Sequence, residues 1–191
     1  MKNHFFAYMA RMKNIKRWGL MRNNQEENIQ EHSLQVAMIA HALAVIHNEV
    51  YGGHIDAGQV MALAVYHETS EVITGDLPTP IKYFNPEIRE AYHAIEAVAD
   101  QKMLSMLPKE LKNAYQPLIV DRDPDLYRYV KAADRISAYA KCLEELKAGN
   151  GEFEKAGNTI LSSIHDMKMP EIEYFLEHFI ESFSLTLDEL N

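Results

Sequence analysis

The chain has 191 residues, of which 47% are hydrophobic, and a formal net charge of −9 at pH 7. This length fits one domain over 1–191 with a sizeable core, and the acidic balance argues against a nucleic-acid partner, which needs a clustered basic face. One cysteine, Cys142, suits a reducing compartment, and the lack of a signal-peptide or membrane-span segment predicts a cytoplasmic protein without a membrane partner.

Capping signals predict the first two long helices. Asn28, with Glu31 three residues later, has the pattern of a capping box and predicts a helix over 28–47. Asp56 follows two glycines that break the chain, and it predicts the N-cap of a second helix over 56–73. Apolar residues recur at helical spacing in the first of these segments, so we expect one face of that helix to be buried.

The second half of the chain is also predicted to be helical. The segment 76–80 contains two prolines and is predicted to be a loop, because prolines at that spacing do not fit inside a helix. An N-cap residue followed by proline marks two later helix starts, at Asn85-Pro86 and Asp123-Pro124. The helices predicted after the loop cover 85–107, 123–146, 154–166 and 171–182. We therefore expect an all-α protein with about seven helices.

Titratable residues come directly after an apolar run, 60–66, in the second predicted helix. A helix that is apolar on every side is buried, and a buried imidazole or carboxylate costs several kcal/mol unless it is paired or bound to a cation. His67 and Glu68 follow this run, and Glu71 comes one helical turn later. We expect a reaction centre here, in which a raised pKa suits Glu71 to acid/base chemistry. A zinc protease helix would need histidine in place of Glu71, which disfavours that class.

Two histidines and two carboxylates on predicted helices could hold one divalent ion. They are His32, His67, Glu68 and Asp134. Such a mixed set suits Mn, Co, Fe, Ni or Zn, and it is too rich in nitrogen for a typical calcium or magnesium site. Each residue also has a plain structural explanation. A single buried histidine is more often a hydrogen-bonded core residue, and Asp134 could pair with the adjacent Arg135.

The order of these residues resembles the H…HD…D pattern of the HD-domain metal-dependent phosphohydrolases. Longer stretches are similar to the bacterial 5′-deoxynucleotidases, and the similarity extends from about His4 to about Leu190. The similar stretches are Arg17-Trp18, 31–37, 66–68, 70–72, 74–80, 82–85 and 141–146. One position departs from the pattern, because Glu68 stands where the family has aspartate. Its side chain is one methylene longer and reaches about 1.5 Å further.

The resemblance implies an HD-domain helical bundle that forms a homodimer and binds one divalent metal ion per subunit. It implies hydrolysis of deoxyribonucleoside 5′-monophosphates, with His32, His67, Glu68 and Asp134 as metal ligands. Glu71 would be the catalytic acid/base. Arg17 would orient the phosphate, and Trp18 would disfavour a 2′-hydroxyl. The nucleoside end of the pocket would be lined by Asp76, Leu77, Pro78 and Thr79.

Other interpretations remain open. Without the resemblance, Arg17 would be expected as a solvated surface charge and Trp18 as a core anchor. Lys82, just past the proline-containing segment, could steer the phosphate or only solvate a turn. The substrate could be another nucleotide or a phosphorylated metabolite. The replacement of aspartate by Glu68 could also have left a nucleotide-binding module without catalytic activity.

Overall fold

The computed structural model describes residues 3–82 and 84–191, which form α-helices, short 3-10 helices and connecting loops without a named strand. The prediction of an all-α fold is confirmed. The α-helices of the described residues are α1 (Phe5–Met9), α2 (Ile29–Glu49), α3 (Ala57–Val65), α4 (Glu71–Thr74), α5 (Thr79–Lys82), α6 (Pro86–Ser105), α7 (Lys109–Ile119), α8 (Pro124–Lys147), α9 (Glu154–His165) and α10 (Pro170–Phe179). Tyr83, in one of the stretches that carried the sequence similarity, lies outside the described residues.

The predicted helix starts are confirmed at four positions. The side chain of Asn28 accepts hydrogen bonds from the backbone amides of Gln30 and Glu31, and Glu31 completes the capping box. These side chains satisfy amide groups that have no partner inside the helix, which is why such residues begin helices. The other confirmed N-caps are Asp56, Asn85 and Asp123.

The second predicted helix is wrong in its length. Helix α3 ends at Val65, a turn follows, and α4 begins only at Glu71. Side chains interrupt the helical ladder, because the carbonyl of Ala64 accepts from His67 Nδ1 at 2.7 Å and that of Tyr66 accepts from Thr69 Oγ1 at 2.7 Å. The adjacent His67 and Glu68 therefore lie in a turn and not on a helix.

The apolar run 60–66 is also less buried than predicted. Val60 and Leu63 are fully buried, whereas Met61 is 42% exposed and Val65 is 38% exposed. Helix α3 thus has one buried face against α2 and one face open to solvent. The burial of His67 comes from the packing around the turn that follows and not from an apolar helix on every side.

Two helices were not expected around prolines. Helix α5 begins at Thr79 inside the segment predicted as loop, and Pro80 occupies its first turn, where a helix needs no amide donor. Helix α7 contains Pro117 near its C-terminal end. Together with α1 and with α4, which is separate from α3, these helices bring the count in the described residues to ten α-helices, above the expected number of about seven.

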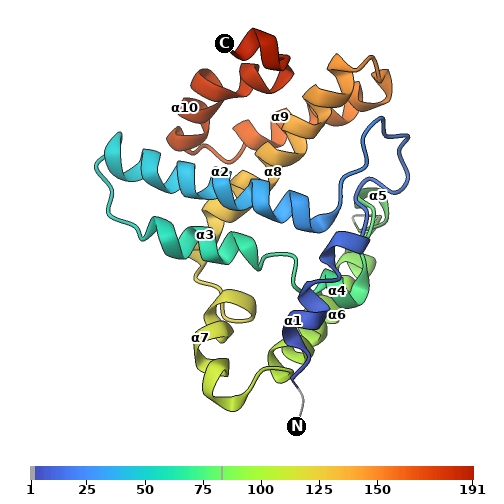
Figure 1. Ribbon diagram of the computed structural model, residues 1–191, viewed down its shortest axis with the longest axis vertical. Helices are drawn as coiled ribbons and strands as arrows, with labels where there is room; N and C mark the ends of the chain where they lie inside the picture. Colours follow the sequence, from blue (N-terminus) through green and yellow to red (C-terminus); the bar gives the residue numbers. More distant parts are fainter. Residues whose placement is uncertain (1–2, 83) are drawn as a thin grey trace.

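The long helices α2 and α8 cross at the centre of the molecule, and α3 runs beside α2 (Figure 1). Helices α9 and α10 pack on one side of this pair, while α1, α4, α6 and α7 lie on the other (Figure 1). The main core draws on α2, α3, α8, α9 and α10, with Leu43, Leu63 and Ile136 fully buried. Each such side chain contributes roughly 1.5–3 kcal/mol by its burial. The central crossing holds the N-terminal turn of α2 against the middle of α8.

A second apolar cluster joins the N-terminal segment to α6 and α7. Its fully or nearly fully buried members include Phe5, Met103 and Ile119, and Ile29 links it to the start of α2. None of the helices in the described ranges is long and apolar enough to cross a membrane.

Candidate metal centre and substrate site

Four predicted ligands converge where α2, α8 and the turn after α3 meet. His32, His67, Glu68 and Asp134 each offer one ligand atom, and these atoms all lie within 4.8 Å of one another. Both imidazoles are fully buried, whereas the side chains of Glu68 and Asp134 are 15% and 26% exposed. The cluster thus opens to solvent on its carboxylate side. Asp134 faces His32 at 3.1 Å, and Arg135 donates to the carbonyl of Ser163, so the alternative of an Asp134–Arg135 ion pair is not supported.

The hydrogen bonds of His32 leave one ring nitrogen free to bind a cation. Ser137 Oγ donates to Gln35 Oε1 at 2.8 Å, so it accepts from His32 Nδ1 at 3.2 Å. Burial and the nearby charge of Arg17 lower the pKa of His32, which keeps the ring neutral. The lone pair on Nε2 then faces Asp134 Oδ1 at 3.1 Å. Two acceptors at this distance are satisfied by a cation between them.

His67 shows the same arrangement more clearly. Its Nδ1 donates to the carbonyl of Ala64 at 2.7 Å, so in the neutral imidazole Nε2 is the nitrogen that carries the lone pair. That Nε2 atom is buried, has no hydrogen-bond partner in the described part of the chain and lies 3.1 Å from Glu68 Oε1. A buried nitrogen acceptor facing a carboxylate is costly unless a cation joins them. The residues present therefore fit a divalent metal ion.

Glu71 lies next to this cluster at the first position of α4. Its side chain is buried, and its Oε2 atom has no hydrogen-bond partner among the described residues. Burial and the charge of Glu68 raise the pKa of Glu71 to about 11, as the sequence predicted in direction. This direction of shift favours the protonated carboxyl, which is the form that can donate a proton.

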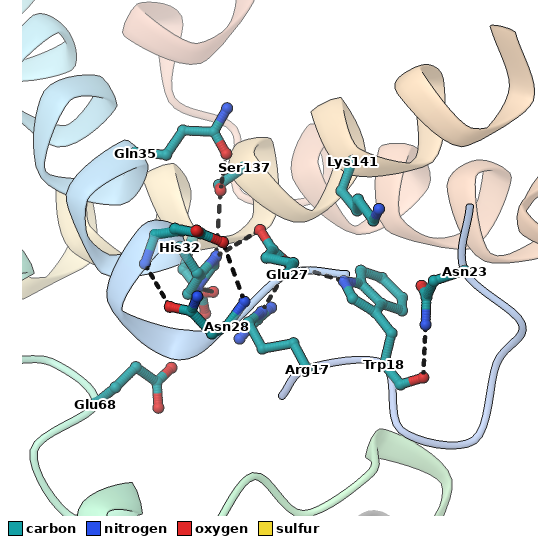
Figure 2. A network of polar contacts seen from close by, with 12 residues as sticks. Arg17, Trp18, Asn23, Glu27, Asn28, His32, Gln35, Glu68, Ser137 and Lys141 are labelled. Carbon is teal, nitrogen blue, oxygen red and sulfur yellow. Dashed lines mark hydrogen bonds and ion pairs between the residues drawn. The ribbon is translucent and has the colours of Figure 1, made fainter. Parts of the chain in front are cut away.

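Arg17 and Trp18 lie side by side on the loop between α1 and α2, with their polar groups directed at one carboxylate (Figure 2). Arg17 Nε donates to Glu27 Oε2 at 3.1 Å, and Trp18 Nε1 donates to the same oxygen at 2.9 Å. The side chain of Arg17 is only 13% exposed, so the expectation of a solvated surface charge is wrong. Trp18 is half-buried, and its ring centroid lies 5.3 Å from that of Phe153.

The backbone of Trp18 adopts a left-handed conformation with φ of 59°. A bulky residue rarely adopts this conformation, which persists where the surroundings enforce it, often at functional sites. Here the Trp18 carbonyl accepts from Met21 N at 2.9 Å and from Asn23 Nδ2 at 3.3 Å. The loop therefore holds the indole in one orientation from both its backbone and its ring nitrogen.

The other predicted substrate residues lie between α4 and α6. Asp76, Leu77 and Pro78 are half-buried and Thr79 is exposed. Burial raises the pKa of Asp76 and the charge of Arg17 opposes this, so the two groups are close enough to interact. Lys82 donates to Glu96 Oε1 at 2.9 Å and lies 4.8 Å from the ring of Tyr92. Its strongest described contacts are therefore with α6.

Glu27 is the main site residue that the sequence did not single out. It lies ten positions from Arg17 in an irregular segment, and no helical or strand period connects the two. The only sequence signal is its place directly before the capping residue Asn28. A carboxylate at that place is common for other reasons, so the signal is weak.

The fold and the site define a class of protein. The structure aligns with an HD-domain phosphohydrolase from Listeria innocua with a TM-score of 0.82 at 24% identity, over 94% of this chain and 88% of that one. It aligns with a cyanophage S-2L HD phosphohydrolase bound to dA and one catalytic Zn²⁺ ion with a TM-score of 0.65 at 20% identity, over 92% of this chain and 96% of that one. The fold is that of the HD-domain phosphohydrolases.

Sequence comparison narrows this class to one family. Residues 4–183 match the YfbR-like 5′-deoxynucleotidases. A 5′-deoxynucleotidase of Vibrio vulnificus (strain YJ016) is 53% identical over 192 aligned positions, which cover 100% of this chain and 99% of that protein. The 5′-deoxynucleotidase YfbR of Escherichia coli (strain ATCC 8739) is 50% identical over 192 positions, which cover 100% of this chain and 96% of that protein. The chain belongs to the YfbR-like 5′-deoxynucleotidase family.

Proposed function

We propose that this protein hydrolyses deoxyribonucleoside 5′-monophosphates to deoxynucleoside and phosphate, with one divalent metal ion per subunit. The observation that carries the proposal is the buried Nε2 of His67, which faces the carboxylate of Glu68 and has no hydrogen-bond partner within residues 3–82 and 84–191. The buried carboxyl of Glu71, whose pKa is raised, lies alongside. The proposal is supported by relatives with 50% and 53% identity that are 5′-deoxynucleotidases. A site that holds a cation beside a proton donor suits the hydrolysis of a phosphate ester.

The metal ligands in this proposal are His32 and His67 through Nε2, and Glu68 and Asp134 through carboxylate oxygens. A bound divalent ion would lower the pKa of a water molecule and polarise a phosphoryl oxygen. The mixed nitrogen and oxygen set favours Mn, Co, Fe, Ni or Zn. Ser137 and the carbonyl of Ala64 orient the two imidazoles by accepting their Nδ1 protons.

In this proposal Glu71 and Arg17 act on opposite sides of the bond that breaks, which joins the phosphorus atom to O5′. The protonated carboxyl of Glu71 gives its proton to the O5′ leaving group, which would otherwise depart as an unstable alkoxide. Arg17 is always charged, and its planar guanidinium can grip two phosphate oxygens at once. Its Nε atom is occupied by Glu27, so the Nη atoms form the edge that would face the phosphate.

Trp18 and the segment between α4 and α6 would contact the nucleoside. In this proposal the indole ring leaves no space for a 2′-hydroxyl, and Asp76, Leu77, Pro78 and Thr79 line the base and sugar end. Lys82 is held by Glu96 and acts as a more distant positive charge that attracts the phosphate.

The test is phosphate release from dAMP and AMP by metal-stripped protein to which Mn, Co, Zn or Mg is added back singly. We expect turnover of dAMP that depends on a transition metal, with AMP a poor substrate, and a loss of this preference in Trp18→Ala. Equal turnover of AMP would indicate a broader nucleotide phosphohydrolase. If the folded protein shows no turnover with any metal, the remaining interpretation is a nucleotide-binding module without catalytic activity.

We also propose that residues 1–191 act as one cytoplasmic domain that assembles as a homodimer. The single domain is supported by α8, which packs against helices from both halves of the chain. The buried free thiol of Cys142 is consistent with a reducing compartment. Exposed apolar side chains one turn apart on α2, Leu34 and Met38, offer a surface for a second copy. Light scattering should give twice the chain mass of 21.9 kDa.

A further inference from the structure

We infer that Glu27 is a positioning residue that holds Arg17 and Trp18 in one fixed arrangement, so that a single carboxylate sets both the rate and the 2′-deoxy selectivity of the enzyme. The inference rests on the roles proposed above for those two residues. It adds a residue that contacts neither the metal nor the reacting bond and that acts through its neighbours.

The geometry joins both side chains to one oxygen atom. Glu27 Oε2 accepts from Arg17 Nε at 3.1 Å and from Trp18 Nε1 at 2.9 Å (Figure 2). The side chain of Glu27 is only 12% exposed, so water competes little for these bonds. Its second oxygen lies 3.8 Å from Nδ1 of His32, which brings the same carboxylate to the edge of the metal cluster.

The backbone fixes Glu27 relative to α2. Arg17 N donates to the carbonyl of Glu27 at 2.9 Å, and Ile29 N donates to the carbonyl of Ile15 at 3.0 Å. An isolated bridge pairs Lys16 with Asn28, the N-cap of α2. The loop over 16–28 is thus closed at its base, directly beside the helix that carries His32. Glu27 therefore couples the positions of Arg17 and Trp18 to the position of the candidate metal cluster.

Both donors depend on this one carboxylate. Within residues 3–82 and 84–191, Glu27 Oε2 is the sole hydrogen-bond acceptor recorded for Arg17 Nε and for Trp18 Nε1. Trp18 also has a left-handed backbone conformation, which is strained for a bulky residue. Without the anchor on its indole ring, the backbone would relax from this conformation more easily. If the carboxylate of Glu27 is removed, the guanidinium of Arg17 and the indole of Trp18 both lose the acceptor that fixes their positions. Rate and sugar selectivity should therefore change together.

The experiment measures kcat and KM for dAMP and AMP in Glu27→Ala, Glu27→Gln, Glu27→Asp and Trp18→Ala. The matched control is Glu26→Ala, because the side chain of Glu26 is 69% exposed and pairs with Lys16 on the surface. We expect Glu27→Ala to lower kcat/KM for dAMP by roughly tenfold to a hundredfold, as for the loss of a charge-assisted hydrogen bond. We expect its dAMP-to-AMP ratio to fall to that of Trp18→Ala.

The two conservative variants separate position from charge. Gln keeps an oxygen at the same reach and should retain most of the dAMP-to-AMP ratio, whereas Asp keeps the charge but withdraws it by about 1.5 Å and should lose the ratio. This pair decides the question even if Glu27→Ala does not fold. In Glu27→Ala/Trp18→Ala the ratio should be no lower than in Trp18→Ala alone, because both changes act on the same indole.

Two results would overturn the inference. In one, Glu27→Ala and Glu27→Asp slow dAMP turnover but keep the wild-type ratio while Trp18→Ala relaxes it, which leaves the role of Trp18 intact and removes that of Glu27. In the other, Glu26→Ala changes the ratio as much as Glu27→Ala does. If Trp18→Ala itself keeps the ratio, the proposed sugar selectivity fails first, and the coupling fails with it.

Discussion

Glu71 is a carboxyl group that its surroundings keep in the acid form. Burial is the largest cause, and the nearby carboxylate of Glu68 adds to it, so that the pKa of Glu71 is raised to about 11. One oxygen of the side chain has no partner among the described residues. A proton donor that is desolvated and partly unsatisfied is suited to give its proton to a group that arrives with the substrate.

At this scale we predict that Glu71→Gln abolishes turnover and keeps nucleotide binding. Glutamine has the shape of a protonated glutamate but cannot release a proton, so kcat for dAMP should fall by roughly a hundredfold to ten-thousandfold. The measurement is kcat together with the equilibrium affinity for dAMP. Glu173→Gln, on the exposed side of α10, is the matched control and should behave as wild type. Near-normal turnover in Glu71→Gln would remove the acid/base role.

Residue types and the family resemblance singled out the four candidate ligands, which the structure brings together, but not the residues around them. His32, His67 and Asp134 stand out because imidazoles and carboxylates are poorly tolerated in apolar segments. Glu27 does not stand out in the sequence, because it meets Arg17, ten residues earlier, only when the loop between them folds back on itself. The sequence also did not predict the contacts of Lys82, which pairs with Glu96 and lies over the ring of Tyr92. Its proposed effect on the phosphate is therefore that of a more distant charge.

At the scale of elements, the four capped helix starts were predictable, whereas helices α5 and α7 and the end of α3 were not. Caps such as Asn28 act through their own side chain within three residues, so the sequence contains the whole interaction. The break after Val65 depends on His67 and Thr69 side chains taking carbonyls that the helix would otherwise use. The packing of the turn decides whether these side chains or the helical amides bind the carbonyls, and the spacing of apolar residues in the sequence does not predict that packing.

The loop over 16–28 is anchored from α8 by a buried carboxylate. Glu145, whose side chain is 1% exposed, accepts from the backbone amides of Asn24 and Gln25 and from the side chains of Lys141 and Asn150. Burial alone would raise the pKa of Glu145, but these hydrogen bonds outweigh it and lower the pKa to about 2. The element that carries Arg17 and Trp18 is therefore tied to the helix that carries Asp134.

We predict that this anchor weakens in acid. Because the folded pKa of Glu145 lies below its usual value, the ionised form stabilises the fold above about pH 4.5, and this stabilisation is lost as the pH falls towards 2. Between pH 5 and pH 3 the loss is about 2 kcal/mol at most. Urea unfolding should show a smaller pH dependence in Glu145→Gln than in wild type. Parallel curves for the two proteins would contradict the prediction, and exposed Glu177→Gln is the control.

For the whole molecule, the four candidate ligands come from three elements that are distant in the sequence. His32 belongs to α2, His67 and Glu68 to the turn after α3, and Asp134 to α8. A cation bound to all four would join these elements at the point where α2 and α8 cross. Binding to the folded state alone raises the free energy of unfolding.

We predict a higher thermal unfolding midpoint when a transition metal is added to the stripped protein. At a metal concentration of about 100 times Kd the gain is roughly 2.7 kcal/mol, which raises Tm by roughly 5–10 °C in a domain of this size. His67→Ala should lose most of this response. The exposed histidine His165, which pairs with Glu173, provides the control variant His165→Ala, which should keep it. An equal response in both variants would show that the metal stabilises the protein from another place.

The separation of His32 and Asp134 along the chain has a consequence for biosynthesis. They lie 102 positions apart, which a ribosome covers in roughly 5 to 20 s. For that time a nascent chain exposes His32, and later His67 and Glu68, without the carboxylate that completes the set. A metal site built from all four candidate ligands would therefore be completed only after α8 has left the ribosome and crossed α2, so an ion that needs the whole set would bind after α8 is made.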